Sequence, residues 1–335
     1  MALSNSEIFL IAGALVVIGI IIFFVLRATV FACKSDYCDT NGCGTDPCGN
    51  SCGSCASGFS CVDGVCEQDC VPDCTNKTCG PDGCGGLCNS CDWWNPADVS
   101  PMAWYDAADA NTITLNGSNV SQWDDKSGNG RHVGQGDPSS QPTKAVRDGL
   151  DVLEFNNSVL LTTANASWLN STAYTIFAVV QYDDIGPFES FYIGTSEGIG
   201  PNNSLIVGKR STNPGLRHSH FGFSDDSIYT WNTDRVMFTH IYRSPGSDSY
   251  ANGNLLESTS DELTSDLVGV KQLNIGSWLR TSSSLPINGA ISEVIITGAL
   301  SDTDRQKVEG YLAHKWDLTE NLPADHPYKN TLPTI

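Results

Sequence analysis

The distribution of apolar residues divides the chain into three regions. Residues 1–32 contain an unbroken apolar run, Ile8–Leu26, that has no charged residue. Residues 33–92 contain few large apolar side chains and every cysteine of the chain. In residues 93–335, short apolar or alternating runs are separated by clusters of Gly, Asn, Asp, Ser and Pro. This pattern predicts an apolar helix, a cysteine-rich neck and a β-rich domain.

The run Ile8–Leu26 has the length of a membrane-spanning helix. Its 19 residues span about 28 Å at about 1.5 Å per residue, close to the roughly 30 Å hydrocarbon core of a bilayer. A cleaved signal peptide is the alternative, but the run is too long for one and the segment MALSNSE before it has no Lys or Arg. We therefore expect a single transmembrane helix whose partner is the lipid bilayer.

The orientation of this helix stays open. Arg27 and Lys34 follow the run, whereas only Glu7 and the α-amino group precede it. The positive-inside rule therefore favours a cytoplasmic location for the remaining chain. The clustered cysteines favour an oxidising compartment instead.

The region 93–335 has the pattern of an antiparallel β-sandwich. Its runs have the length and composition of strands and are bounded by turn-forming residues. The predicted strands are Asp151–Phe155, Tyr174–Gln181, Phe191–Gly194, Ser204–Val207, His218–Phe223, Val236–Tyr242, Gln272–Gly276 and Ala290–Thr297. In the last of these, Ile291, Val294 and Ile296 lie among polar residues, so we expect one covered and one wet face.

One helix and one hairpin are also predicted in this region. Ser301 is suited to cap a helix at about residues 302–316, and two aspartates occupy its first turn, where the helix dipole favours anions. A stripe of mostly apolar residues at helical spacing predicts that this helix packs on the sandwich. The stripe consists of Val308, Tyr311, Leu312, Lys315 and Trp316. Asn252-Gly253, within residues 248–256, is a hairpin turn signal.

The cysteines of residues 33–92 form an internal repeat. The spacing x4, x4, x3, x2 that begins at Cys38 recurs 36 residues later, from Cys74 to Cys91. Because so few apolar side chains cannot build a core, we expect disulfides to hold this neck, typically at about 2–4 kcal/mol each. Their connectivity stays open. The predicted framework consists of Cys33, Cys38, Cys43, Cys48, Cys52, Cys55, Cys61, Cys66, Cys70, Cys74, Cys79, Cys84, Cys88 and Cys91.

Zinc binding is the alternative role for these cysteines. Cys52 and Cys55, like Cys88 and Cys91, have the spacing of a zinc knuckle. The neck contains no histidine, and its x4 spacings are too regular for paired zinc ligands. Disulfides are therefore favoured.

The charge of the chain excludes one class of partner. Eighteen Lys and Arg residues face 38 Asp and Glu residues, which gives a formal net charge of -20. Binding to nucleic acid requires clustered cations that neutralise phosphates. No such cluster is visible, so we expect no nucleic acid partner.

No catalytic constellation is recognisable after the neck. A retaining glycoside hydrolase needs two carboxylates about 5–5.5 Å apart, and the motifs E-x-D-x-E and E-x-D-x-x-E are absent. Asp124-Asp125, Asp183-Asp184 and Asp225-Asp226 are adjacent pairs that a strand would point to opposite faces, so we expect them in loops. The sequence also lacks a G-x-S-x-G elbow and a glycine-rich phosphate loop. We predict no catalytic residues and no enzyme.

Metal ligands and glycan acceptors are weaker candidates. His218 and His220 would present two imidazoles on one strand face, as a metal site or simply as exposed histidines. The Asp pairs are candidate Ca²⁺ ligands, and no other cofactor is predicted. Seven N-x-S/T sequons are glycosylation sites only if the chain enters a secretory lumen. They are Asn76, Asn116, Asn119, Asn156, Asn165, Asn170 and Asn202.

Three stretches carry resemblances to known families. Cys74–Cys91 resembles the CGPDGCGG repeats of secreted and surface proteins and of large viruses, which implies a spacer role. Ala103–Val133 (AWYDAADANTITLNGSNVSQWDDKSGNGRHV) and Gly298–Tyr328 (GALSDTDRQKVEGYLAHKWDLTENLPADHPY) resemble laminin-G-like, concanavalin A-like domains of bacterial surface proteins and large DNA viruses. The resemblance implies a jelly-roll fold over roughly residues 100–330, often with Ca²⁺ at its rim.

Three functions are compatible with these features. The leading interpretation is a non-enzymatic structural or adhesion protein, a minor capsid protein that links an internal virion membrane to capsid proteins. The alternative is a lectin-like surface protein that binds carbohydrate through exposed aromatic residues. A glycoside hydrolase ranks lowest. The expected location is a virion membrane and capsid or the cell surface.

Overall fold

The computed structural model divides into two compact units, Met1–Cys91 and Asp92–Ile335. The residues that it describes are 42–45, 51–55, 59–62, 65–68, 80–81, 87–88, 94–162, 165–170, 172–196, 202–211, 215–260, 263, 265–280 and 283–334.

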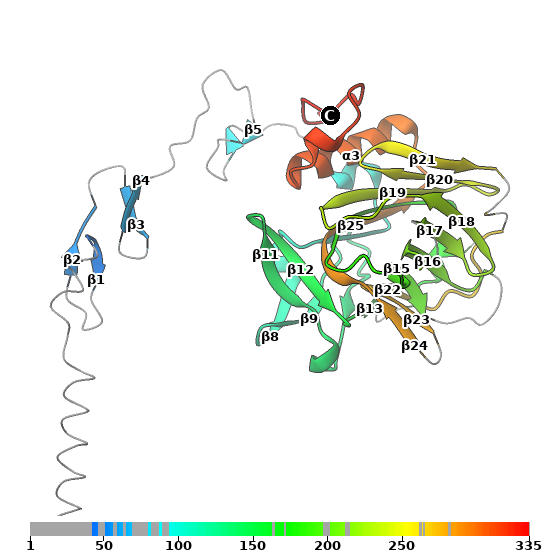
Figure 1. Ribbon diagram of the computed structural model, residues 1–335, viewed down its shortest axis with the longest axis horizontal. Coiled ribbons are helices and arrows are strands. Elements are labelled where there is room, and N and C mark those ends of the chain that lie inside the picture. Colours follow the sequence, from blue (N-terminus) through cyan, green and yellow to red (C-terminus); the bar gives the residue numbers. More distant parts are fainter. Residues whose placement is uncertain are drawn as a thin grey trace, which may run out of the picture. The chain divides into compact units, whose positions relative to one another are not determined.

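The first unit contains short antiparallel hairpins in its described part (Figure 1). They are β1 (Gly44–Thr45) with β2 (Ser51–Gly53), β3 (Phe59–Val62) with β4 (Val65–Gln68), and β5 (Gly80–Pro81) with β6 (Leu87–Cys88). Disulfides join Cys43 to Cys61 and Cys55 to Cys66. Cys61 and Cys66 lie opposite each other in the β3–β4 register, yet each bonds to a cysteine next to the other hairpin. The prediction of a disulfide-rich N-terminal region is confirmed.

The expected membrane location is contradicted. Within the described ranges, no helix is long and apolar enough to cross a bilayer. The α-helix found there, α3 (Asp302–Lys315), has 14 residues, which at about 1.5 Å each fall short of the roughly 30 Å core of a bilayer. The run Ile8–Leu26, on which the expectation rested, lies outside the described residues. The single-pass location at a virion membrane or cell surface is therefore corrected.

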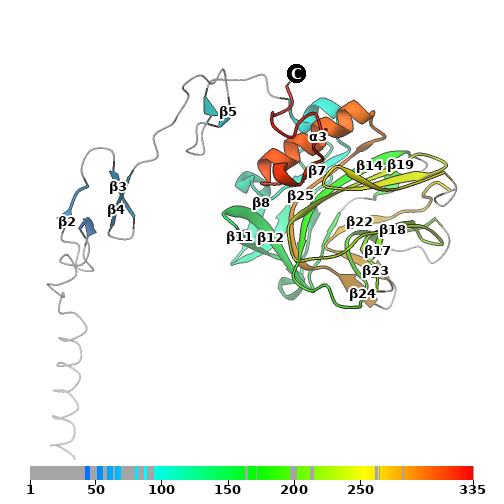
Figure 2. The ribbon, with the colours of Figure 1, turned by 45° about the horizontal axis from the view of Figure 1, so that its top comes forward.

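The second unit is an antiparallel β-sandwich, as predicted (Figure 2). One layer runs in the order β11, β12, β25, β14, β19, β20 and β21, with β7 also paired to β25. Its strands are β7 (Ala103–Asp106), β11 (Thr143–Arg147), β12 (Leu150–Asn156), β14 (Tyr174–Tyr182), β19 (Val236–Tyr242), β20 (Ser247–Ala251), β21 (Asn254–Thr259) and β25 (Asn288–Gly298).

The other layer runs in the order β8, β9, β10, β13, β22, β15, β16, β17 and β18. Its strands are β8 (Ile113–Asn116), β9 (Asn119–Trp123), β10 (Val133–Gly134), β13 (Leu160–Thr162), β15 (Ser190–Ser196), β16 (Leu205–Lys209), β17 (Gly215–His220), β18 (Phe223–Ile228) and β22 (Gln272–Ile275). The hairpin of β23 (Ser277–Arg280) and β24 (Ser283–Pro286) contacts β15. A single pair between β9 and β11, Asn119 with Thr143, joins the layers into one continuous sheet.

Short 3-10 helices complete the connections of this unit. They are η1 (Pro96–Val99), η2 (Ala110–Thr112), η3 (Pro138–Ser140), η4 (Ser167–Leu169) and η5 (Thr319–Asn321).

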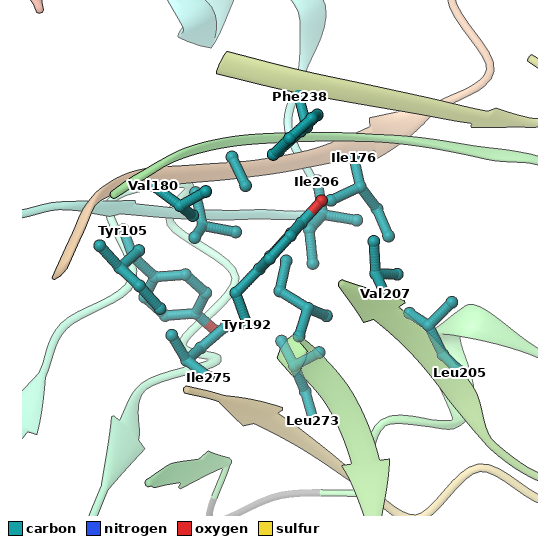
Figure 3. Packing of buried hydrophobic residues seen from close by; sticks show 14 of the residues in the cluster. Tyr105, Ile176, Val180, Tyr192, Leu205, Val207, Phe238, Leu273, Ile275 and Ile296 are labelled. Carbon is teal, nitrogen blue, oxygen red and sulfur yellow. The ribbon is translucent and has the colours of Figure 1, made fainter. Parts of the chain in front are cut away.

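The main core lies between the two layers and is rich in aromatic and β-branched side chains (Figure 3). Alternate residues of β14, such as Ile176 and Val180, face Tyr192 and Val207 of the other layer. The residues between them, Phe177 and Val179, face outward into a second cluster beneath α3. Both faces of β14 are therefore buried, which explains its near-continuous apolar sequence.

The strand β25 departs from simple alternation because it contains a β-bulge. Val179 pairs with Glu293, but the next residue of β14, Val180, pairs with Ile291, so Ser292 is the additional residue. The bulge allows Ile291 and Val294, three positions apart, to enter the same core. The expected wet face of this strand is wrong, because α3 covers it and Ile295 is fully buried there.

The helix α3 lies on the outer face of the layer that contains β14, β19 and β25 (Figure 2). The Ser301 side chain accepts a hydrogen bond from the Asp304 amide and caps the helix, which begins at Asp302. Val308, Leu312 and Trp316 are buried against the sheet.

One predicted turn and one predicted strand have different outcomes. Asn252 and Gly253 have φ values of 47° and 75° and join β20 to β21, as a two-residue hairpin turn requires. The predicted strand His218–Phe223 is wrong, because β17 ends at His220 and β18 begins at Phe223. Gly222, with φ of 99°, lies in the turn between them, in the left-handed region that glycine tolerates.

Gly310 of α3 offers a test of how closely the C-terminal segment packs on the helix. A Cβ at this position would lie 2.4 Å from the Cβ of Tyr328. Alanine normally stabilises a helix by about 1 kcal/mol relative to glycine. Here overpacking should prevail, so we expect Gly310→Ala to lower the free energy of unfolding by about 1–2 kcal/mol in chemical denaturation.

Gly298→Ala is the matched control, since no heavy atom of the described residues lies within 4 Å of its added Cβ. We expect that change to stay within about 0.5 kcal/mol. An increase in stability for Gly310→Ala would contradict the close packing.

Candidate functional site

A buried charge network under α3 brings together the two stretches that carry the laminin-G-like resemblance. Glu293 of β25 is 0% exposed and accepts hydrogen bonds of 2.7 Å from the indole nitrogens of Trp104 and Trp316. Lys315 Nζ lies 2.7 Å from Glu293 and 2.7 Å from Asp106. One carboxylate thus joins the first stretch, β25 and α3.

The protonation of this network follows from burial and pairing. Burial raises the pKa of Glu293, and Lys315 opposes this shift. Burial would also raise the pKa of Asp106, but Lys315 and Lys126 lower it below its usual value. Because Glu293 is closed off from solvent and both of its oxygens are bonded, it is suited to hold the fold and not to reach a substrate.

The Asp124-Asp125 pair lies in a loop, as expected, and its second member organises that loop. Asp125 accepts hydrogen bonds from the backbone amides of Trp104, Ser127 and Arg131 at 2.9 Å each. This explains the DDKSGNGRH part of the resemblance as loop structure. Asp183 also lies outside the strands and pairs with Arg147.

The Asp225-Asp226 pair does not lie in a loop. Both residues belong to β18 and point to opposite faces of it. Asp225 is buried, and its Oδ2 accepts a hydrogen bond from Ser247. Asp226 is bound on the other face by Arg217 at 2.8 Å and also by Arg210.

His218 and His220 share one strand face, but that face is the interior. Both are 0% exposed, so the expectation of exposed histidines is wrong. Their Nε2 atoms lie 2.8 and 2.7 Å from the Tyr174 hydroxyl. Among the described residues, they belong to no set of three ligand atoms that could hold a metal ion.

The described part of the chain contains a single set of three potential metal ligands that lie close together, the sulfurs of Cys43, Cys55 and Cys66. All three are consumed in disulfides, and zinc requires free thiolates. The zinc alternative that used Cys55 therefore does not fit, and the described residues form no carboxylate set for Ca²⁺. Cys52 is also disulfide-bonded, and Cys91 lies outside the described residues.

The sequons differ in their environments. Asn116, Asn156 and Asn165 are exposed, whereas Asn119, Asn170 and Asn202 are half-buried. The side-chain amide of Asn119 donates to Pro138 O, and Asn170 Oδ1 accepts from the backbone amide of Val270. Asn76 lies outside the described residues.

An open cleft of about 400 Å³ lies where three loops meet. The loops follow β14, β16 and β18, which are distant in sequence. The lining residues are Ile185, Gly186, Pro187, Lys209, Arg210, Ser211, Thr230 and Trp231. They comprise an indole, apolar groups, two hydroxyls and two cations, and no carboxylate is among them.

The aromatic wall of the cleft is rigidly held. Trp231 donates its indole N–H to Gly215 O at 3.1 Å. Its ring centroid lies 4.8 Å from that of Tyr182, 5.0 Å from that of Tyr229 and 5.4 Å from that of Phe238. Edge contacts of this kind fix the plane of the indole.

The cationic wall organises the neighbouring loop. Lys209 is 1% exposed and donates to the carbonyls of Gly186 and Phe188 at 2.6 and 2.5 Å. Burial lowers the pKa of Lys209, and Asp184 opposes this effect. Arg210 Nη1 binds Asp226, whereas its Nε has no hydrogen-bond partner among the described residues.

The sequence alone does not indicate this cleft. Its residues come from three separate loops, and the chain pairing that brings these loops together cannot be read from local patterns. The available signals were Trp231 and Ile185 in turn-rich segments, because large apolar residues are unusual there. Ile185, Phe188 and Ile228 are all exposed, at 44%, 40% and 76%.

No family model matches the chain, and no curated protein matches its sequence. Solved structures show weak similarities. Domain 4 of AbnA, a GH43 extracellular arabinanase from Geobacillus stearothermophilus in complex with arabinotriose, has 14% identity and a TM-score of 0.45, and the match covers 61% of this chain and 95% of that domain.

Two sialidase-related structures are similar at the same level. Trypanosoma rangeli sialidase with sialic acid has 13% identity and a TM-score of 0.44, over 71% of this chain but only 36% of the sialidase chain. The CBM40 of Ruminococcus gnavus IT-sialidase, bound to alpha2,3 sialyllactose, has 15% identity and a TM-score of 0.37, over 46% of this chain and 92% of that one. With TM-scores below 0.5, these similarities carry no inference about function.

The network under α3 predicts a large effect for Glu293→Gln. The amide removes the negative charge beside Lys315 and leaves one oxygen for two indole donors. We expect the free energy of unfolding to fall by about 2–4 kcal/mol, measured by chemical denaturation at neutral pH. Glu320→Gln, at an exposed position, should change it by less than about 0.5 kcal/mol. Equal effects of the two changes would contradict the structural role of Glu293.

Proposed function

We propose that the sandwich is a non-enzymatic carbohydrate-binding domain and that the loop cleft is its sugar site. The observation that carries this proposal is the combination of a fixed indole, Trp231, with the hydroxyls of Ser211 and Thr230 in one open cleft. Apolar sugar faces stack on aromatic rings, while sugar hydroxyls need donors and acceptors at the rim. The sequence offered this function as the alternative to a capsid role.

The charge of the cleft favours an acidic saccharide. Lys209 and Arg210 line it, in a chain whose net charge is -20. Two carboxylates pair with Arg210, namely Asp226 and, at 4.0 Å, Glu189. Both also pair with Arg217, and neither is a lining residue. A ligand carboxylate or sulfate would therefore meet Arg210, beside the buried positive charge of Lys209, without a competing acid in the lining.

The non-enzymatic part of the proposal rests on the state of the buried carboxylates. Asp106 and Glu293 bind Lys315, and Glu309 binds Arg305. General acid–base chemistry needs carboxyl groups that can reach a substrate. These three serve the attachment of α3 instead.

The capsid role that led the sequence interpretation has less support. Its membrane link is contradicted, and no feature of the described residues favours capsid proteins as partners. The laminin-G-like resemblance is compatible with either role, because a fold alone does not fix function.

A saccharide array with the full-length chain tests the proposal. We expect binding to acidic oligosaccharides, weaker binding to neutral ones, and weakening at high salt because exposed charges are screened. Arg210→Ala should lower affinity by at least about tenfold, since a charge-assisted hydrogen bond contributes about 1.5–3 kcal/mol. Thr230→Ala should lower it by about two- to tenfold, since a neutral hydrogen bond contributes about 0.5–1.5 kcal/mol.

Arg243→Ala is the matched control for Arg210→Ala. Arg243 is an exposed arginine that also pairs with an aspartate, Asp248, and it does not line the cleft. The Arg243→Ala variant should bind saccharides with the affinity of the unmodified chain. No binding to any saccharide, with or without Ca²⁺, would reject the proposed function.

A further inference from the structure

Three histidines meet in the interior at one end of the sandwich. His218 and His220 of β17 and His240 of β19 are each 0% exposed. The ring centroid of His218 lies 5.2 Å from that of His240 and 6.1 Å from that of His220. The two layers of the sandwich therefore face each other through imidazoles at this end.

The hydrogen bonds determine the neutral tautomers of two of these rings. His220 Nδ1 lies 2.7 Å from Ser265 O, and a carbonyl only accepts, so Nδ1 carries the proton. His220 Nε2 must then accept the Tyr174 hydroxyl proton. His218 Nε2 consequently donates to the same oxygen, which leaves His218 Nδ1 as a bare lone pair with no hydrogen-bond partner in the described part of the chain.

A proton added to this cluster has no favourable position. On His220 it would displace the Tyr174 donor, and on His218 Nδ1 it would place an N–H where the described residues offer no acceptor. His240 binds Tyr192 through Nε2 and Ser249 through Nδ1, at 2.7 and 3.2 Å. Two imidazolium ions about 5–6 Å apart would also repel in a medium of low dielectric constant.

The acidic groups around the cluster are already engaged. Asp225 of β18 lies opposite His218 in the strand register and accepts from Ser247 of β20. Asp266, in the segment before β22, accepts from the Tyr242 hydroxyl at 2.7 Å.

The remaining titratable groups that face the cluster are Tyr174 of β14, Tyr192 of β15 and Tyr242 of β19. Burial raises the pKa of each of these tyrosines.

The imidazoles are correspondingly hard to protonate. Burial lowers the pKa of His220 to about 4 and that of His240 to about 3. Burial, followed by the charges of His240 and His220, lowers the pKa of His218 well below its usual value. In a state in which β17 is detached, the histidines would have their ordinary pKa of about 6.5 and would bind protons below that pH. In the folded state they stay neutral over the same pH range.

The histidine strand also supports the cleft. β17 begins at Gly215, whose carbonyl accepts both the Trp231 indole N–H and the Arg210 amide. Arg217, two residues later, binds the aspartate that pairs with Arg210. Trp231 also packs on Tyr182 of β14 and Phe238 of β19, in the facing layer. Detachment of β17 and β18 from that layer and from β16 would therefore disturb the aromatic and the cationic residues of the cleft together.

We propose that the histidine cluster is an acid-operated release device, in which protonation of the buried imidazoles detaches β17 and β18 and dismantles the cleft. The release of a saccharide rests on the proposed function, whereas the opening does not. The direction follows from linkage: these histidines destabilise the closed state progressively as the pH falls from about 6.5 toward their folded pKa values.

Hydrogen exchange of the full-length, ligand-free chain tests the opening between pH 7 and pH 4.5. After correction for intrinsic exchange rates, we expect peptides within residues 215–228 and 229–231 to lose protection as the pH falls. The slope of the logarithm of protection against pH reports the protons taken up on opening. It should reach about 2–3 between pH 6 and pH 4.5 when three histidines take part.

The double variant His218→Gln/His240→Gln should lower this slope by about two. Glutamine can still donate to Tyr174, and His218 Nδ1 has no partner to lose among the described residues. His132→Gln and His314→Gln, at positions outside the interior, are the controls and should leave the slope unchanged. An unchanged slope in the double variant would overturn the proposal.

If the double variant does not fold, the unmodified chain still tests the proposal. NMR signals of three of its six histidines should remain those of neutral imidazole at pH 5.5 for as long as residues 215–228 stay protected. Protonation of all six histidines while residues 215–228 remain protected from exchange would overturn the proposal. Because neither measurement uses a ligand, a negative saccharide array would reject the proposed function without affecting this result.

Discussion

The carboxylate of Glu293 is the interaction on which the arrangement of the sandwich depends. It lies on β25, the strand that pairs with β14 on one side and with β7 and β12 on the other. Its bonds to Trp104, Lys315 and Trp316 fasten α3 over the layer that carries β14 and β19. A buried charge is costly unless it is fully paired, so this position specifies both where the helix lies and which residues surround it.

Two parts of the sandwich have different roles. The two stretches in which the sequence resembles laminin-G-like domains contribute Trp104, Asp106 and Trp316, all of which serve internal attachment. The cleft is built instead by loops that follow β14, β16 and β18, where Lys209, Arg210 and Trp231 meet. The residues of these two stretches are therefore separate from those that line the cleft.

Local patterns predicted the elements whose signals are local. The Ser301 cap placed the start of α3, and Asn252-Gly253 placed a hairpin turn. Val236–Tyr242 coincides with β19 because it is a continuous apolar run between turns.

The predictions are wrong where a segment distant in sequence determines the environment of a residue. The wet face expected for β25 is dry because a helix that follows it in sequence returns to cover it. The sequence predicts His218 and His220 as a metal site or as exposed residues, because polar side chains normally face water. In the structure, hydrogen bonds to Tyr174 satisfy both in the interior. The cleft combines three loops that no local pattern brings together.

The disulfides that join described cysteines of the first unit, Cys43–Cys61 and Cys55–Cys66, have a topological consequence. In chain order the bonded cysteines alternate, Cys43, Cys55, Cys61 and Cys66, so the loop closed by one bridge contains one end of the other. A protease that cuts the backbone once, anywhere between the first and the last of these residues, therefore leaves both pieces covalently attached. Such a segment tolerates nicking without losing whatever it connects, and only reduction of the sulfur bridges releases the fragments.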